Sequence, residues 1–429
     1  MNYLILPDCS DFNRGDQSLI WETIRIAKEA GFEGDYYVQS DNPSSCLQSE
    51  SEGIHVFSPI LKHPSRHKGE NNISYRNVLF KWGFKALCDL FFSLGVLFIV
   101  KFPFFYWMLG RDIRKTIKLY RSSGAVFVKG GGFIHSFGGM TAFYFIYYHM
   151  YPIYLAHRLN IPVFILPNSF GPIDGFLCKW QVKKALQKCK LIYCREHISY
   201  EYMIKTFPSI DFRVSFDLGF YLQKQKKDIN IPFPQGKKRV AITVRPYRFP
   251  EFNNGQELYK KYIEGIIGFC ERILVEDYFP VFIQHTISEN KHEDDMQSIK
   301  EIISRLPSGK FGVFSDLSYN CREMKFLYSN FDYIVGTRFH SVIFSMAENV
   351  PAIAIAYGGN KTRGIMRDLE LSNYVIGIDE ITSNNLFTLF SNLVANEKSV
   401  KESLRKSSIK ISLERRKVIS TLNKMLYEI

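Results

Sequence analysis

The stretch that decides the fold is residues 332–351, which reads DYIVGTRFHSVIFSMAENVP. A short apolar run typical of a buried strand ends at Gly336, and a helical pattern begins after His340. In open α/β folds such turns lie at the carboxyl ends of the strands, where ligands bind. Arg338 supplies a cationic fork, and His340 supplies a group that titrates near neutral pH. The N-terminus of the helix adds N–H groups that can bind an anion. The turn therefore predicts a site that binds a small anion and performs acid–base chemistry on it.

The same strand–turn–helix pattern recurs along the whole chain, with one polar, linker-like interruption at residues 223–238. This repetition predicts two Rossmann-like α/β domains with parallel sheets. We expect an N-terminal domain over 1–225, a C-terminal domain over 237–400 and an amphipathic helix over 401–429. The apolar runs that carry this prediction are 3–7, 124–128, 162–166, 191–194 and 213–216, then 239–244, 279–283, 310–314, 333–335 and 352–355.

Composition narrows the classes of function. The 429 residues carry 55 Lys and Arg against 42 Asp and Glu, a formal net charge of +13, which suits anionic partners. No nucleic-acid-binding module is recognisable and the basic residues are scattered, so we expect no nucleic acid partner. The eight cysteines form no Cys-x-x-Cys pair, and we predict no metal site. The N-terminus lacks the features of a signal peptide, which predicts a cytoplasmic protein.

Residues 84–109 form an unusually hydrophobic insert in the N-terminal domain. Its uninterrupted apolar run, 90–100, is shorter than the roughly 20 residues that a spanning helix needs. One interpretation is a buried or self-packed helix pair. The other is an element that contacts the membrane surface, with aromatic side chains at the interface and nearby Lys and Arg facing anionic lipids, which would place the protein at the inner face of the cytoplasmic membrane.

Further candidate residues follow other predicted strands of the C-terminal domain. Lys361 follows the strand next to the opening turn, so it could share a pocket with His340, although a solvated loop lysine is the alternative. Arg245 ends the first strand of this domain and is a second candidate anion clamp, with a purely structural role as the alternative.

The N-terminal domain offers weaker signals. Gly130, Gly131 and Gly132 allow a ligand close to the backbone, but a tight turn explains them equally well. Arg195 and Glu196 could form an internal ion pair, or Glu196 could act on a sugar hydroxyl. Asp16 and Asp217 are candidate hydroxyl ligands or bases, with helix capping as the alternative. The tips of these strands are expected to gather at one sheet edge.

Taken in order, these motifs resemble the polysaccharide pyruvyl transferase family over roughly residues 3–370. The matching segments are Asn13-x-Gly15-Asp16, Gly130–Gly132, Ser169-Phe-Gly171-Pro172, Arg195-Glu196-x-x-Ser199, Asp217-x-x-Phe220, Val244-Arg245-Pro246, Arg338-Phe-His340 and Tyr357…Lys361. The sequence departs from the family at Phe339, where leucine is more usual, and in the insert 84–109. The resemblance implies a glycosyltransferase-B-like fold with a cleft between its domains, phosphoenolpyruvate as donor, a sugar acceptor and no metal or other cofactor.

The implied product is a pyruvate ketal on a sugar of a bacterial surface glycan such as a capsule or exopolysaccharide, with a lipid-linked acceptor preferred because of the apolar insert. We expect His340 as the acid, helped by Arg338, with Glu196 or Asp16 acting on a hydroxyl. The substrate-binding set would be Arg245, Lys361, Arg195, Gly130, Gly131, Gly132, Ser169 and Tyr357. The alternatives are a nucleotide-sugar glycosyltransferase on the same fold, and a non-catalytic assembly factor at the membrane surface.

Overall fold

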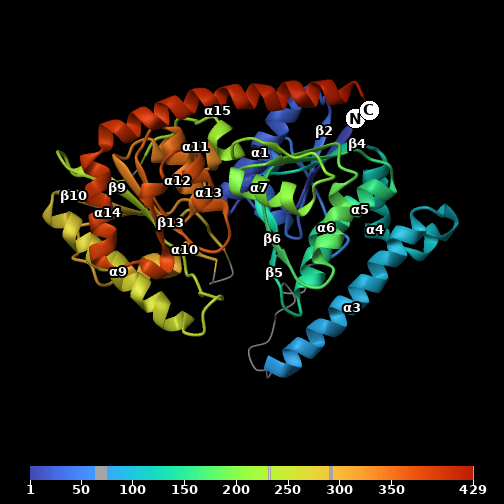
Figure 1. Cartoon of the computed structure of the whole chain (residues 1–429), viewed down its shortest axis with the longest axis horizontal. Coiled ribbons are helices and arrows are strands. Elements are labelled where there is room, and N and C mark those ends of the chain that lie inside the picture. The colour runs from blue at the N-terminus through green and yellow to red at the C-terminus, as the bar shows by residue number, and fades with distance from the viewer. Residues whose placement is uncertain (63–74, 230, 232, 289–292, 429) are drawn as a thin grey trace. The chain divides into compact units, whose positions relative to one another are not determined.

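The structure is a computed structural model of the whole chain and describes residues 1–62, 75–229, 231, 233–288 and 293–428 (Figure 1). The chain divides into two compact units. Unit 1 comprises Met1–Ser10, Thr23–Ser215 and Val418–Ile429, and unit 2 comprises Asp11–Glu22 and Phe216–Lys417. The structure therefore differs from the boundary expected after residue 225: the second unit begins at Phe216. It also takes residues 11–22, because Asn13 bridges to Thr286 and the Ile287 N–H donates to the Phe12 carbonyl at 2.9 Å.

Unit 1 contains an all-parallel sheet in the order β3-β2-β1-β4-β6-β7-β8, with β5 also paired to β6. The order reverses direction between β1 and β4, as in a doubly wound fold. The strands are β1 (Asn2–Leu6), β2 (Asp35–Gln39), β3 (His55–Phe57), β4 (Ser123–Val128), β5 (Gly131–Phe137), β6 (Val163–Asp174), β7 (Leu191–Cys194) and β8 (Arg213–Val214).

One expectation about this sheet is wrong. The turn expected after residue 128 is present, since β4 ends at Val128, but the turn expected after residue 166 is not: β6 continues from Val163 to Asp174, and β5 runs beside its second half. Gly131 and Gly132 therefore begin a strand, and Ser169 lies inside one. The strand persists past Pro167 because β4 pairs with the first part of β6 and β5 with the second part, so the backbone of β6 keeps a partner over both parts.

The helices of unit 1 follow the strands. They are α2 (Leu47–Ser51), α3 (Tyr75–Ile99), α4 (Arg111–Arg121), α5 (Ala142–Arg158), α6 (Cys178–Leu186) and α7 (His197–Thr206), with the short helices η1 (Pro43–Cys46) and η3 (Pro103–Met108). Some of the many phenylalanines pack against one another in the core of unit 1. The ring centroids of Phe32 and Phe127 lie 5.1 Å apart edge to face, and those of Phe127 and Phe164 lie 5.4 Å apart in a stack.

Helix α3 contains the hydrophobic insert's apolar run, and its environment differs from the buried alternative. Among the described residues, one helix is long and apolar enough to cross a membrane by length and composition, the 18-residue window Trp82–Ile99 with a mean hydropathy of 1.6. Only 11% of that window is buried. Figure 1 shows α3 as a long rod beside the body of unit 1. The apolar run of the insert is therefore not a buried core helix, although α3 and η3 of the insert do contact one another through Phe98 and Phe102.

Unit 2 has a six-stranded parallel sheet in the order β11-β10-β9-β12-β13-β14, the Rossmann order with its reversal between β9 and β12. Ligands of such sheets bind outside the carboxyl ends of the strands at this reversal. The strands are β9 (Lys238–Thr243), β10 (Tyr278–Ile283), β11 (Gly312–Phe314), β12 (Tyr333–Gly336), β13 (Ala352–Ala356) and β14 (Val375–Gly377).

Helices cover both faces of the second sheet, with α9 and α14 on one side and α11 and α12 on the other (Figure 1). The helices are α8 (Leu218–Tyr221), α9 (Gly255–Val275), α10 (Asp295–Ile303), α11 (Cys321–Tyr328), α12 (Phe339–Ala347), α13 (Lys361–Asp368) and α14 (Ser383–Ala395), with η4 (Ser372–Tyr374) and η5 (Ile378–Glu380). Helix α1 (Arg14–Glu29) begins in unit 2 and ends in unit 1, and α15 (Glu397–Leu426), the predicted C-terminal helix, does the same.

Candidate active site

The opening strand-to-helix turn lies where the sequence predicts, at the reversal of the second sheet. Gly336 ends β12 and pairs with Thr243 of β9 and Ala354 of β13, so three strands end side by side. A Cβ at Gly336 would lie 2.5 Å from Val342 Cγ2, so only glycine lets α12 start so close to the strand. Arg338 is the N-cap residue of α12, and His340 stands in its first turn.

Arg338 is largely buried, and acids hold its guanidinium. Its Nε donates to Asp295 Oδ1 at 2.7 Å, and its Nη2 donates to the carbonyl of Glu293 at 2.6 Å. Asp295 is fully buried, which raises its pKa to about 6 against the opposing effect of Arg338. Arg338 is therefore part of a buried ion pair, and its charge acts on the site mainly through the field of that pair.

A second cationic cluster surrounds Tyr357, directly after β13. The Arg245 guanidinium lies 4.5 Å from the centre of the Tyr357 ring and hydrogen-bonds to its hydroxyl. The Lys361 ammonium lies 4.9 Å from the same ring centre. Arg245 and Arg338 both approach the Glu293 carboxylate, at 3.3 and 3.6 Å. Arg245, Lys361 and Tyr357, predicted from two separate segments of the chain, are thus brought together.

The charges in this cluster change the acidity of Tyr357. Burial alone would raise its pKa, but Lys361, Arg245 and Arg338 together lower it to about 7. The phenol therefore ionises near neutral pH and can serve as a counter-ion for the cations. The Arg245 Nε is buried and has no hydrogen-bond partner among the residues that the structure describes. The cluster can therefore exchange an internal negative charge for that of a ligand.

His340 belongs to a pair with a buried carboxylate. Its Nε2 lies 3.8 Å from Asp217 Oδ1, and Asp217 is fully buried at the start of α8, where it also accepts from the Gly219 N–H at 2.8 Å. Asp217 thus combines the capping role with contact to the imidazole. The carboxylate therefore lies close to a ring that can carry a proton in general acid–base catalysis. This pair is suited to delivering a proton.

The segment 11–22 also packs against the imidazole of His340. A Cβ at Gly15 would lie 2.3 Å from His340 Nδ1, so the ring rests directly against the glycine backbone. Asn13 shapes this turn: its Oδ1 accepts from the Gly15 N–H at 3.1 Å and its Nδ2 donates to Asp16 at 2.8 Å. Asp16 therefore belongs to unit 2, next to the glycine that contacts His340, and not to the N-terminal domain in which it was predicted. Its role on a hydroxyl stays a prediction.

Sequence reasoning missed two groups in unit 2. Asp295 fixes Arg338 from the first turn of α10, and His285 is buried with its Nδ1 3.0 Å from the Tyr328 hydroxyl. Burial, together with His340, Arg338 and Arg14, lowers the pKa of His285 well below its ordinary value, so it remains neutral. A signal was available for His285, which follows β10 at the same sheet edge, but not for Asp295, which begins α10 well after that strand has ended.

The candidates of unit 1 form a closed polar network. Arg195 Nε donates to Ser169 Oγ at 2.6 Å, and Ser169 donates to Glu196 Oε2 at 2.7 Å. Glu196 is fully buried, lies 3.5 Å from Arg195 and is also bonded by Ser199. This arrangement favours the internal ion pair over direct action of Glu196 on a sugar. Gly132 lies against this network, because a Cβ there would approach Arg195 Nη2 to 3.0 Å.

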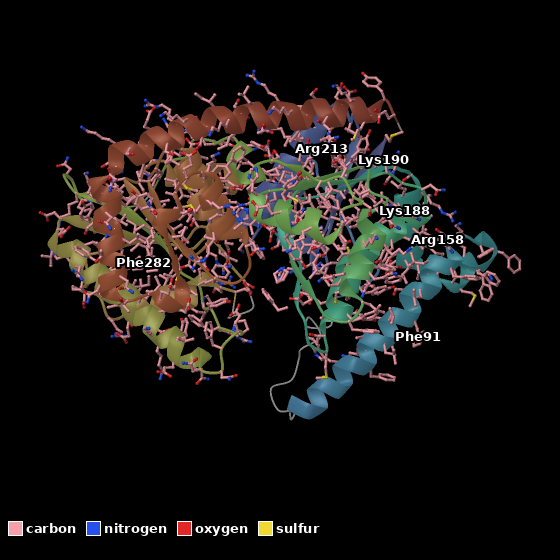
Figure 2. All side chains as sticks on the ribbon, viewed as in Figure 1. Phe91, Arg158, Lys188, Lys190, Arg213 and Phe282 are labelled. Atoms are coloured by element: carbon pink, nitrogen blue, oxygen red, sulfur yellow. The ribbon has the colours of Figure 1, made fainter. Side chains whose placement is uncertain are left out.

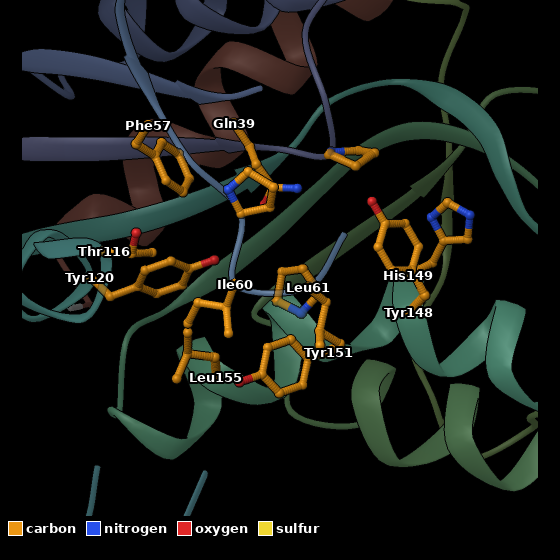
Figure 3. Close-up of a pocket in the computed structure, with 13 residues that line it drawn as sticks. Gln39, Phe57, Ile60, Leu61, Thr116, Tyr120, Tyr148, His149, Tyr151 and Leu155 are labelled. Carbon is orange, nitrogen blue, oxygen red and sulfur yellow. The ribbon is translucent and has the colours of Figure 1, made fainter. Parts of the chain in front are cut away.

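The small cavity of unit 1 is unrelated to this chemistry. Figure 3 shows it lined mainly by apolar and aromatic side chains, among them Phe57, Tyr120 and Tyr151. Its volume of about 20 Å³ admits roughly one water molecule and no sugar. Within the described part of the chain, no group of three or more His, Cys, Asp or Glu residues could hold a metal ion.

The fold and the site together define a class of protein, the α/β enzymes with two Rossmann-like sheets and an acid–base site beside an anion-binding cluster. The family profile of polysaccharide pyruvyl transferases matches residues 13–359. The chain belongs to the polysaccharide pyruvyl transferase family, and it is an enzyme of that family acting in polysaccharide biosynthesis.

Comparison with individual proteins agrees with this assignment. The chain is 22% identical over 305 residues to the amylovoran biosynthesis protein AmsJ of Erwinia amylovora, covering 68% of this chain and 70% of that protein. Its fold is similar to a glycosyltransferase from Rickettsia africae, with a TM-score of 0.56, 13% identity and coverage of 99% and 98%. It is also similar to MnaA of S. aureus, solved with UDP, with a TM-score of 0.60, 10% identity and coverage of 100% and 97%. These structures confirm the glycosyltransferase-B-like fold.

We expect Gly15→Ala to displace the His340 ring, because the new methyl group would overlap Nδ1. The NMR resonances of the imidazole should shift, and the free energy of unfolding should fall by about 1–3 kcal/mol despite the better helix propensity of alanine. Gly95→Ala is the matched control, since a Cβ there meets nothing within 4 Å. An unchanged His340 signal in Gly15→Ala would contradict the described contact.

We expect one tyrosine to ionise at about pH 7 in the folded protein, because of the cations around Tyr357. Ultraviolet difference absorbance of tyrosinate across neutral pH measures it. The transition should vanish in Tyr357→Phe and move to higher pH in Lys361→Met, while Tyr427→Phe, at an 83% exposed position, leaves it unchanged. A transition that survives in Tyr357→Phe would show that another group titrates.

Proposed function

We propose that this enzyme transfers a pyruvyl group from phosphoenolpyruvate to two hydroxyls of one sugar in a lipid-linked bacterial surface glycan, forming a cyclic pyruvate ketal. The observation that carries the proposal is the cluster of Arg245, Lys361 and Tyr357 on the same sheet edge as the His340–Asp217 pair. It combines an anion site with a proton donor at the reversal point of a Rossmann sheet.

The cationic cluster matches the charge of the donor. Phosphoenolpyruvate carries a carboxylate and a phosphate, and both need cationic or N–H partners. Arg245 and Lys361 supply two positive charges at one ring, and Arg338 adds to the positive field although Asp295 holds it. The bound anions would take over the role of the Tyr357 phenolate, which then accepts a proton. The free N–H groups at the start of α12 strengthen the same field.

The His340–Asp217 pair suits the proton transfer that starts the reaction. In our proposal the imidazolium donates its proton to the methylene carbon of the enol ester, which becomes the methyl group. Positive charge develops at the adjacent carbon, and one sugar hydroxyl attacks it. The bond from that carbon to the phosphate oxygen then breaks, and the second hydroxyl closes the ring. Of the two hydroxyl protons, one restores His340 and the other leaves on inorganic phosphate, so the reaction balances.

The main rival is a nucleotide-sugar-dependent glycosyltransferase, since a glycosyltransferase from Rickettsia africae has a similar fold. Such an enzyme also needs cations, in that case for a diphosphate. The chemical distinction is the acid: protonation of an enol carbon requires a donor such as the His340–Asp217 pair. Fold similarity alone does not decide between the two donors.

We expect transfer of carbon label, but not phosphorus label, from phosphoenolpyruvate to a galactose- or mannose-containing acceptor, in an acid-labile ketal. His340→Gln should lower kcat by about a hundredfold or more, and Asp217→Asn, which keeps the α8 cap, by about tenfold or more. His55→Gln, on an exposed strand end of unit 1, is the matched control with unchanged rate. Label transfer from nucleotide sugars and none from phosphoenolpyruvate would overturn the proposal in favour of the rival.

A further inference from the structure

The outer face of α3 is an exposed apolar surface. Large apolar side chains recur there at helical spacing, each about half exposed or more: Phe84, Leu87, Phe91, Leu94 and Phe98 are 63, 50, 67, 47 and 53% exposed. Figure 2 shows Phe91 on the side of the helix away from the body of unit 1. A contiguous apolar face of this kind is unfavourable in water and marks a docking surface.

The opposite face of α3 is fixed to α5 by specific contacts. Ser93 and the Tyr147 hydroxyl lie 2.7 Å apart, and the Tyr144 hydroxyl donates to Asp89 at 2.9 Å. Arg158 Nε donates to the Leu97 carbonyl at 2.9 Å, and Val96 is buried in the core of unit 1. The helix is therefore attached through its C-terminal half, with its apolar side outward.

Sheet topology excludes a single crossing of a membrane by α3. The helix lies in the chain between β3 and β4, and β1 pairs with both β2 and β4. One crossing would place β1, β2 and β3 on one side of the bilayer and β4 on the other, which the β1–β4 pairing forbids. A helix that passes the length and hydropathy test can therefore contact lipid only from the surface.

The short helix η3 extends the apolar surface with aromatic residues. Phe104, Trp107 and Met108 are 82, 71 and 59% exposed, far more than such side chains usually are. The Phe98 and Phe102 rings, 4.7 Å apart, connect this tip to α3. Tryptophan and phenylalanine at such exposed positions suit the boundary between headgroups and acyl chains.

Two groups of cations adjoin the apolar surface. The first lines a hollow of about 380 Å³ along α4 beside Tyr106 and consists of Arg111, Arg114, Lys115, Lys118 and Arg121. The second lines a groove of about 690 Å³ between α3, α5 and α6, where Leu90, Leu94 and Trp180 form apolar walls and Lys101, Arg158, Lys184 and Lys188 provide the charges. Arg158 and Lys188 are labelled in Figure 2. Such charges complement anionic lipid headgroups.

We propose that α3, η3 and α4 form a membrane-docking surface that binds an anionic bilayer from one side, with the outer face of α3 and the η3 aromatics among the acyl chains and the flanking cations at the headgroups. This surface would hold the enzyme beside a lipid-linked acceptor. The inference does not depend on the donor chemistry, because it rests only on residues of unit 1.

Vesicle flotation of the full chain tests the proposal. We expect stronger binding to vesicles in which about a third of the phosphatidylcholine is replaced by phosphatidylglycerol than to phosphatidylcholine alone. Phe104→Glu with Trp107→Glu should weaken binding by about tenfold or more, whereas Val275→Glu, at an 86% exposed apolar position, should not. Arg114→Glu with Lys118→Glu should weaken binding to the anionic vesicles only. The control pair Lys406→Glu with Lys410→Glu has the same spacing and the same charge change, and it should leave binding unchanged.

Cys88 offers a direct probe of depth. It is exposed on α3, and the other seven cysteines are buried or half-buried. A polarity-sensitive fluorophore on Cys88 should shift its emission to the blue on anionic vesicles and be quenched by lipid-borne nitroxides. Label transfer to a soluble acceptor should stay unchanged in both double variants, which separates this proposal from the donor chemistry. Protein that stays in solution with either vesicle, or that self-associates through Phe104 and Trp107 instead of binding lipid, overturns the proposal.

Discussion

The carboxyl ends of three adjacent strands hold several positive charges together, and the proposed chemistry depends on them. Arg245 follows β9, Arg338 follows β12, and Lys361 begins the helix after β13. Such charges repel one another once they lose part of their water, so each needs an internal partner. Asp295 forms an ion pair with Arg338, and Glu293 lies near both arginines. The acidic phenol of Tyr357 interacts with Arg245 and Lys361. Of these partners, Tyr357 has its pKa closest to 7, and that of Asp295 lies at about 6.

His340, the proton donor in the proposed mechanism, is positioned by close approach of the backbone. Gly15 leaves room for the imidazole, Asp217 faces it from the start of α8, and the bridge from Asn13 to Thr286 brings the first turn of α1 to this edge. A small segment near the N-terminus thus belongs to the unit that carries the acid–base pair. This explains why an Asn-x-Gly-Asp motif accompanies an Arg-x-His motif more than 300 residues later in the chain.

The sequence predicted the features that depend on local pattern. The strand ending at Gly336, the turn with Arg338 and His340, and the places of Arg245 and Lys361 after neighbouring strands follow from periodicity and from the parallel α/β fold. The shared pocket of Lys361 and His340 stays a prediction. Features that depend on burial did not emerge. Asp295 lies in a polar stretch of ordinary appearance, and Glu196 reads equally as a base or as a buried ion pair. The sequence did not predict that β6 continues past Pro167, because its composition there is typical of a turn and only the pairing with β5 keeps it extended. The exposure of α3 likewise depends on which face α5 covers.

The central claim is that phosphoenolpyruvate replaces the Tyr357 phenolate as the counter-ion of Arg245 and Lys361. Calorimetric titration at about pH 8 in buffers of different ionisation enthalpy measures the protons exchanged on binding. Two negative groups entering the cluster should raise the pKa of the phenol again, so the wild-type protein should take up about one proton per ligand and Tyr357→Phe about none. Binding without proton uptake in the wild type, or with equal uptake in Tyr357→Phe, would contradict the account.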